Sequence, residues 1–271
     1  MVTALHALAL ALYLASEIML AASLVGGRRG APRWGTALVA GAVAVHAVGL
    51  AAYALRYGEL PLVGLAASLS TLAFLIGVLL LGVAVVRDAG PVGLVLLPIV
   101  ALLLVVAHIL GIAPAGEPPA FRGLWFALHV VLAFLGYAGL ALAFAAGFLY
   151  LLQFRALKGK RFGKSFRFFP ALETLDRLGA RALVVGFPAL SLGLALGWAW
   201  TVRFQRSLAA ADPQVIWGVL TWIIFLLALG ARRSGAGGDR RGALASVVGF
   251  LIVVLAYVAL RLTAAEGRAF L

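Results

Sequence analysis

Cysteine is absent from the 271 residues, and acidic residues are rare, with 9 Asp and Glu against 22 Lys and Arg. The absence of cysteine excludes disulfides, CxxC thiol chemistry and iron–sulfur ligation. Any metal or cofactor must therefore be held by His, Met, Glu or backbone groups.

Charged residues of either sign are also scarce, at 11% of the chain, whereas 65% of the residues are hydrophobic. The apolar residues form runs of roughly twenty, the length that crosses the hydrocarbon core of a bilayer. These runs are apolar on all sides rather than amphipathic, and they leave no room for a soluble domain. The sequence therefore predicts an all-α, polytopic integral membrane protein with a single transmembrane domain over residues 1–271.

Apolar runs between clusters of charge, Pro and Gly predict eight transmembrane helices. The expected ranges are 3–26, 36–55, 65–86, 94–113, 124–152, 183–202, 214–231 and 243–263. Residues 1–26 lack a basic start and a cleavage site, so we expect a retained first span rather than a signal peptide. An even number of spans puts both termini on one side of the membrane.

Most Lys and Arg lie in the loops after the first, fifth and seventh predicted helices. The positive-inside rule makes these loops cytoplasmic and places both termini outside. Short membrane-flanking loops account for the net charge of +13, so we expect no nucleic-acid partner. The longest is the cytoplasmic basic loop 153–182, which ends in "PALETLDRLGAR". This stretch resembles a short amphipathic helix at the membrane interface, and a docking surface for a cytoplasmic protein is the alternative.

Five ionisable side chains lie inside the predicted spans: His6, Glu17, His46, His108 and His129. Such groups are costly at membrane depth and mark functional sites by default. With about 1.5 Å of rise per residue, His108 and His129 each lie roughly 7 Å below the outer interface, on neighbouring antiparallel helices. Two neutral imidazoles at one depth are the ligand set of bis-histidine haem. Alternatively, each histidine bonds a backbone carbonyl, and Glu17 pairs with a hydroxyl or a cation or reaches a hydrated pocket.

Tryptophan gathers at the predicted outer ends of the spans. The outer residues are Trp125, Trp198, Trp200 and Trp217, with Trp222 about a turn deeper and Trp34 alone on the inner side. A symmetric aromatic belt would populate both interfaces, so this bias indicates an aromatic platform. The planar guanidinium groups of Arg203 and Arg206 lie in the same outer loop and suit carboxylates such as haem propionates, with ordinary loop charges as the alternative.

Small residues follow His129 along one face of the same helix, at Ala133, Gly136, Ala143 and Gly147. A stripe of this kind permits close helix contact, and we interpret it as packing.

Four motifs stand in order along the chain. They are "VHAVGLAAYALRYGELP" (45–61), "LWFALHVVLAFLGYAGLALAFAAGFLYLL" (124–152), "GWAW" (197–200) and "DPQVIWGVLTWIIFLLAL" (212–229). Together they resemble the cytochrome c assembly membrane family, the CcsA (ResC)-type haem-handling proteins. The resemblance implies that His46 is the first histidine of a membrane haem site and His129 the first of an external haem site.

The partner histidines of that family are missing. Gly230 stands where the helix after the tryptophan loop usually ends in His, and the last outer segment reads "EGRAFL" around Arg268 and Ala269. These departures favour the HemX-like or YpjD-like branch, which is associated with tetrapyrrole synthesis and haem-protein assembly. His129 then needs another partner, for which His108 is the depth-matched candidate and His46 or His6 are the alternatives.

The leading hypothesis is a bacterial inner-membrane haem-handling protein, not an enzyme, that binds haem b in the outer half of the bundle. His129 and His108 would ligate iron, and His46, the outer tryptophans and the two arginines would complete the site. The second hypothesis is a cofactor-free regulator or scaffold of tetrapyrrole biosynthesis or haem-protein assembly that holds a cytoplasmic enzyme through loop 153–182. The third is a transporter of a small tetrapyrrole or anion, suggested by Glu17 and the arginines. Many inverted-repeat transporters have broken helices at corresponding positions of their two halves. Pro98 and Pro188 do not interrupt matching helices in this way, which weakens the transporter hypothesis without excluding it.

Overall fold

The computed structural model describes residues 1–27, 33–87, 90–114, 123–160, 163–203, 213–233 and 237–263. Its regular elements there are all helices: α1 (Val2–Val25), α2 (Arg33–Tyr57), α3 (Leu65–Arg87), the short 3-10 helix η1 (Gly90–Val92), α4 (Gly93–Leu110), α5 (Leu124–Lys158), α6 (Lys164–Phe168), α7 (Leu172–Arg203), α8 (Pro213–Arg232) and α9 (Gly238–Thr263). By length and composition, eight of the described helices can cross a membrane. The predicted all-α architecture with eight spans is confirmed.

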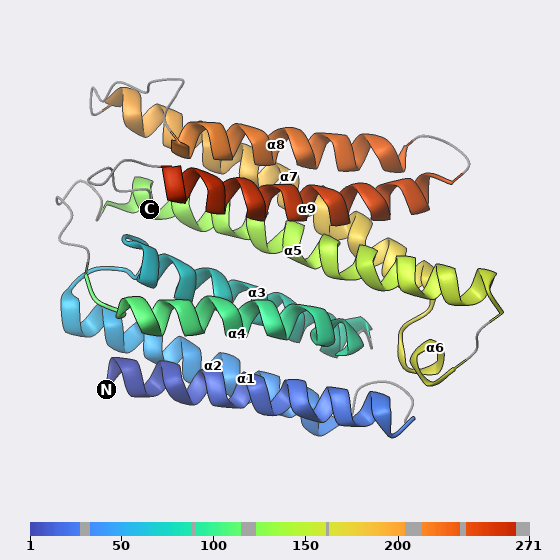
Figure 1. Cartoon of the computed structure of the whole chain (residues 1–271). Coiled ribbons are helices and arrows are strands. Elements are labelled where there is room, and N and C mark those ends of the chain that lie inside the picture. The colour runs from blue at the N-terminus through green and yellow to red at the C-terminus, as the bar shows by residue number, and fades with distance from the viewer. Residues whose placement is uncertain are drawn as a thin grey trace.

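The spans pack as two groups (Figure 1). In the N-terminal group (α1–α4), α1 lies against α2 and α4, and α3 packs on α4 and α2. In the C-terminal group (α5 and α7–α9), α5 lies against α7 and α9. The contact between α3 and α5 joins the two groups. The start of α1 and the end of α9 lie at one end of the bundle, and α6 lies at the other.

Helix α5 is the most buried span because it touches helices of both groups. Its small residues permit this packing. A Cβ added at Gly136 would lie 3.2 Å from the backbone Cα of Leu190 on α7, and one at Gly147 would lie 2.8 Å from the backbone oxygen of Ala243 on α9. The predicted stripe of small residues is thus confirmed as a contact surface, used on two neighbouring helices.

The predicted loop 153–182 is shorter in the structure. At about 1.5 Å per residue, the 35 residues of α5 and the 32 of α7 span roughly 50 Å each, well beyond the roughly 30 Å of a hydrocarbon core. The "PALETLDRLGAR" stretch is helical from Leu172 onward, but it continues into the α7 span instead of forming a separate interfacial helix. The reason is packing, since its residues Leu175 and Leu178 are buried in the main core.

Candidate functional site

Three of the four histidines meet in the N-terminal group. The ring centroid of His6 on α1 lies 5.3 Å from that of His46 on α2 and 6.5 Å from that of His108 on α4. His6 and His46 are fully buried, and His108 is half-buried. The cluster forms because α1 packs between α2 and α4, so that its buried positions face both helices.

The hydrogen bonds of this cluster leave two ring nitrogens uncommitted. His6 Nδ1 lies 2.8 Å from the carbonyl oxygen of Val2, which can only accept, so His6 carries its proton on Nδ1. The Nε2 of His46 lies 3.0 Å from the hydroxyl oxygen of Ser70 on α3. The remaining nitrogens, His6 Nε2 and His46 Nδ1, are buried without a hydrogen-bond partner. Buried polar atoms are normally paired, so two adjacent exceptions mark this place as a candidate ligand site.

His108 differs from its two neighbours in having a backbone carbonyl oxygen near each ring nitrogen. Its Nδ1 donates to the carbonyl oxygen of Leu104 at 2.8 Å, and its Nε2 lies 3.4 Å from the carbonyl oxygen of Thr3. A neutral imidazole has one N–H, so with the proton on Nδ1 His108 is bonded to one backbone carbonyl, that of Leu104 on its own helix.

A line of polar groups continues along α1 from this cluster. The ring of Tyr13 lies 6.1 Å from that of His46, and its hydroxyl is buried against Gly77 of α3 without a partner. One turn further, the Oε2 atom of half-buried Glu17 is also buried and unpartnered. The expected pairing of Glu17 is therefore not seen at this atom. The sequence singled out Glu17 but missed Tyr13 and Ser70, which carry no charge and look ordinary in an apolar span.

His129 lies in the C-terminal group, against α7. Its Nδ1 donates to the carbonyl oxygen of Gly193 at 2.7 Å, and a Cβ at Gly197 would lie 2.7 Å from the same nitrogen. The described residues place no hydrogen-bond partner on its Nε2. A histidine held through Nδ1 with Nε2 left open has the orientation that metal-ligating histidines use.

The structure thus brings His108 to His6 instead of to His129. The sequence matched His108 to His129 by depth, but depth does not fix which neighbour a side chain faces. The pairing of His108 with His129 as two iron ligands stays a prediction. Among the described residues, no group of three or more His, Asp or Glu is arranged to hold a metal ion.

The outer tryptophans have unlike environments. Trp198 is 65% exposed and Trp125 51%, and the Trp125 indole donates to the carbonyl oxygen of Leu196. Trp200 is buried against Phe126 on α5. Trp217 instead packs between Tyr137 and Tyr257 and donates to Val253 on α9. The start of α5 and the end of α7 therefore share an aromatic contact, between Phe126 and Trp200. Trp217 packs elsewhere, between α5 and α9.

The arginines expected near these tryptophans are only partly covered by the structure. Arg203 is exposed at the end of α7. Arg206, Arg268 and Ala269 lie outside the described residues. The transporter interpretation, which rests partly on these arginines, stays a prediction. The scaffold interpretation, which rests on loop 153–182, also stays a prediction.

The eight apolar helices and the buried histidines define a polytopic membrane protein with intramembrane imidazole groups. A family model described as Cytochrome C assembly protein matches residues 38–265. The chain belongs to this family.

Curated relatives named Cytochrome c biogenesis protein CcsA align with about half of the chain. The relative from Guillardia theta is 30% identical over 155 residues, which are 52% of this chain and 52% of the relative. The one from Chlamydomonas reinhardtii is 31% identical over 144 residues, 53% of this chain and 40% of the relative. The one from Prochlorococcus marinus (strain MIT 9312) is 29% identical over 159 residues, 52% of each. The chain thus spans about half the length of these relatives or less.

Proposed function

We propose that this chain is a haem-handling protein of cytochrome c assembly, and that His6 and His46 are its principal candidates for holding the iron. The observation behind this choice is the pair of uncommitted nitrogens, His6 Nε2 and His46 Nδ1, on fully buried rings 5.3 Å apart. His46 is also the residue for which the family resemblance implied a membrane haem site without supplying a partner.

The residues around the pair fit haem chemically. Haem iron takes neutral imidazole nitrogens as ligands, and each of the two histidines would offer one. Coordination would satisfy two buried polar atoms that otherwise cost free energy. The rings of Phe74 and Tyr13 lie 5.5 and 6.1 Å from His46 and supply an apolar, aromatic surround. When bound, haem supplies an iron that can change its oxidation state, and the protein contributes binding, orientation and exclusion of water.

His129 is the candidate for a second, outer position. The backbone carbonyl of Gly193 fixes its ring, and the exposed Trp125 and Trp198 lie at the same ends of α5 and α7. An amphipathic indole there can contact a flat apolar ligand while remaining partly in water. The protein's own part is to bind and present haem, with no covalent step by its side chains.

The proposal also includes the branch of the family, the membrane and the type of haem. The lost partner histidines support a HemX-like or YpjD-like member, and the basic loops support a bacterial cytoplasmic membrane with both termini outside. The cofactor expected there is haem b, because the chain has no cysteine to attach the macrocycle covalently.

Visible spectra of the purified full-length protein, oxidised and dithionite-reduced, test the proposal. Reduced haem bands should weaken strongly in His6→Ala and His46→Ala and persist in His108→Ala, the matched control from the same cluster. Loss in His108→Ala and His129→Ala alone would overturn the assignment and support the pair that the sequence predicted. A protein that stays colourless after haem is added would overturn haem handling itself.

A further inference from the structure

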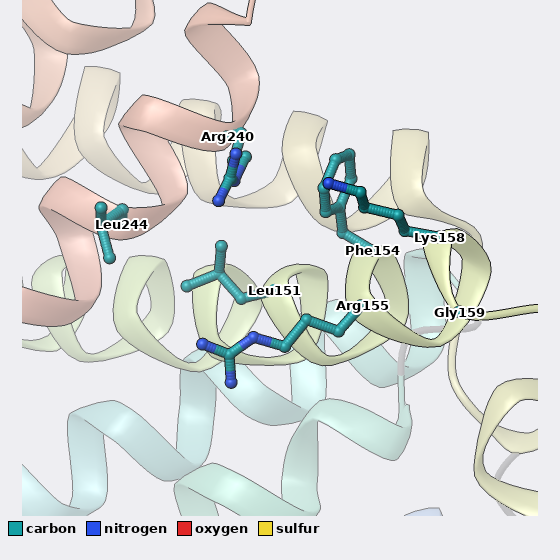
Figure 2. A pocket seen from close by; sticks show the side chains of 7 residues that line it. All are labelled: Leu151, Phe154, Arg155, Lys158, Gly159, Arg240 and Leu244. Atoms are coloured by element: carbon teal, nitrogen blue, oxygen red, sulfur yellow. The ribbon is translucent and has the colours of Figure 1, made fainter. Parts of the chain in front are cut away.

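A cleft of about 410 Å³ opens between the C-terminal end of α5 and the N-terminal end of α9, at the α6 end of the bundle. From α5 it is lined by Leu151, Phe154, Arg155 and Lys158, and from α9 by Arg240 and Leu244. Figure 2 shows these side chains, with Arg240 on α9 facing the Phe154 ring on α5. The Arg240 guanidinium carbon lies 5.3 Å from that ring's centroid.

The charge of the cleft is of one sign. Three of its lining side chains are cations, and all three are exposed. No acidic residue lines it, although Asp239 precedes Arg240 on α9. The ion pairs recorded in the described part of the chain, Glu173–Arg177 and Asp176–Arg232, do not involve these cations. The positive pole at the start of α9 and the negative pole at the end of α5 offset one another, so the side-chain cations set the charge of the cleft. The cleft therefore favours an anion.

The apolar residues of the cleft are arranged in a definite order. On α5, Leu151 comes one turn before Arg155 and two turns before Lys158, so the cations lie toward the helix end. On α9, Arg240 stands at the helix start and Leu244 one turn deeper. On both helices the cations thus lie nearer the helix end and the leucines lie deeper along the span. Arg240 is the second residue of the apolar span Asp239–Leu260, and the end of a span is where headgroups are expected.

We infer that this cleft binds an acidic membrane phospholipid. Its phosphate would lie among Arg155, Lys158 and Arg240, and the first carbons of an acyl chain would lie along Leu151, Phe154 and Leu244. A phospholipid has the same order of charge and apolar surface as the two helices, and it is present at that depth. Basic sites between transmembrane helices recognise acidic lipids in this manner. The site is separate from the histidines and independent of haem binding.

Native mass spectrometry of the detergent-purified full chain tests this, with phosphatidylglycerol and phosphatidylcholine of identical acyl chains. The wild-type protein should prefer the acidic lipid by about tenfold or more. The preference should vanish in the triple variant Arg155→Gln/Lys158→Gln/Arg240→Gln. It should survive in Arg33→Gln/Arg167→Gln/Arg181→Gln, which removes the same charge from exposed positions outside the cleft. Arg155→Lys/Arg240→Lys, which keeps the charge, should also retain it.

Three results would overturn the inference. Equal affinity for both lipids would exclude recognition of charge. Equal loss in the two triple variants would mean that overall charge, and not the cleft, attracts the lipid. Displacement of the bound lipid by millimolar inorganic phosphate would show that the cleft recognises the anion alone, without the acyl chain.

Discussion

The two groups of helices differ in the kind of contact that holds their helices together. The C-terminal group brings backbones together: Gly136, Gly139 and Gly147 of α5 meet backbone atoms of α7 or α9. The N-terminal group buries more polar side chains, among them His6, His46 and Ser70. Among the described residues it holds four buried side-chain atoms without a partner, whereas the C-terminal group holds two, Gln153 Oε1 and Arg232 Nε. Close backbone contact gives a rigid support, whereas unpaired buried polar groups cost stability and are kept where a ligand needs them. The difference indicates that the N-terminal group keeps polar groups for a buried ligand site, while the C-terminal group is held together by close backbone contact.

The largest effect should come from the backbone contacts of the C-terminal group. Gly147→Ala adds a Cβ that would lie 2.8 Å from the Ala243 backbone oxygen, and a packed backbone cannot yield as a side chain can. We expect the free energy of unfolding to fall by about 1–3 kcal/mol, measured by thermal unfolding in detergent. Gly82→Ala on α3 is the control, since its Cβ would meet nothing within 4 Å. Equal stability of both variants would contradict the contrast between the two groups.

The ion pairs on α7 give the next effect. Asp176 and Arg232 are 22% and 11% exposed and link α7 to α8, whereas Glu173 and Arg177 on the same helix are 77% and 56% exposed. Asp176→Asn leaves Arg232 partly buried without its counter-charge and should cost about 2 kcal/mol of unfolding free energy. Glu173→Gln should cost about 0.5 kcal/mol or less. Added salt should lower the stabilising effect of the exposed Glu173–Arg177 pair more than that of the Asp176–Arg232 pair. An equal loss for both pairs in thermal unfolding would contradict the idea that burial shields the Asp176–Arg232 pair from solvent.

The hydrogen bonds that hold the α6 segment to α5 and to α1 give the next effect. Gln153 Nε2 lies 3.0, 3.3 and 3.4 Å from the carbonyl oxygens of Pro170, Phe169 and Phe166. Gln153→Leu removes these bonds and should speed trypsin cleavage after Lys164 and Arg167 several-fold, at a cost of about 1 kcal/mol.

Lys164→Met is the comparison for that variant. It breaks the exposed bond from Lys164 to the Val25 carbonyl on α1 and leaves Gln153 intact. Cleavage after Arg167 should change little. If it rose as much as in Gln153→Leu, the attachment to α1 would hold α6 in place instead.

The last effect has the opposite sign and belongs to the N-terminal group. The Tyr13 hydroxyl is buried and unpaired, so Tyr13→Phe should raise the free energy of unfolding by about 1 kcal/mol. The measurement is the melting temperature in detergent, which should rise. Tyr53→Phe should lower it slightly, because that hydroxyl donates to Glu59 at 3.3 Å. A loss of stability in Tyr13→Phe would show that the hydroxyl has a partner, which would weaken the contrast between the two groups.

Much of the architecture could be predicted from sequence because crossing a membrane depends on local composition. The expected spans 36–55 and 65–86 lie within three residues of α2 and α3 at every end. The prediction failed mainly at loop 153–182, where α5 and α7 continue past the apolar core. Those extensions are stabilised by tertiary partners, such as the buried Leu175 and the Asp176–Arg232 pair, which hydropathy does not register.

The candidate site was predicted only in its parts. The sequence by itself determined that four histidines and a glutamate lie in apolar spans, since a run of about twenty apolar residues must be helical in a bilayer whatever surrounds it. It could not determine that His6, His46 and His108 meet while His129 packs on α7. Only the tertiary structure decided this. Depth follows from position along one helix, but the neighbour that a side chain faces depends on how all the helices pack around it.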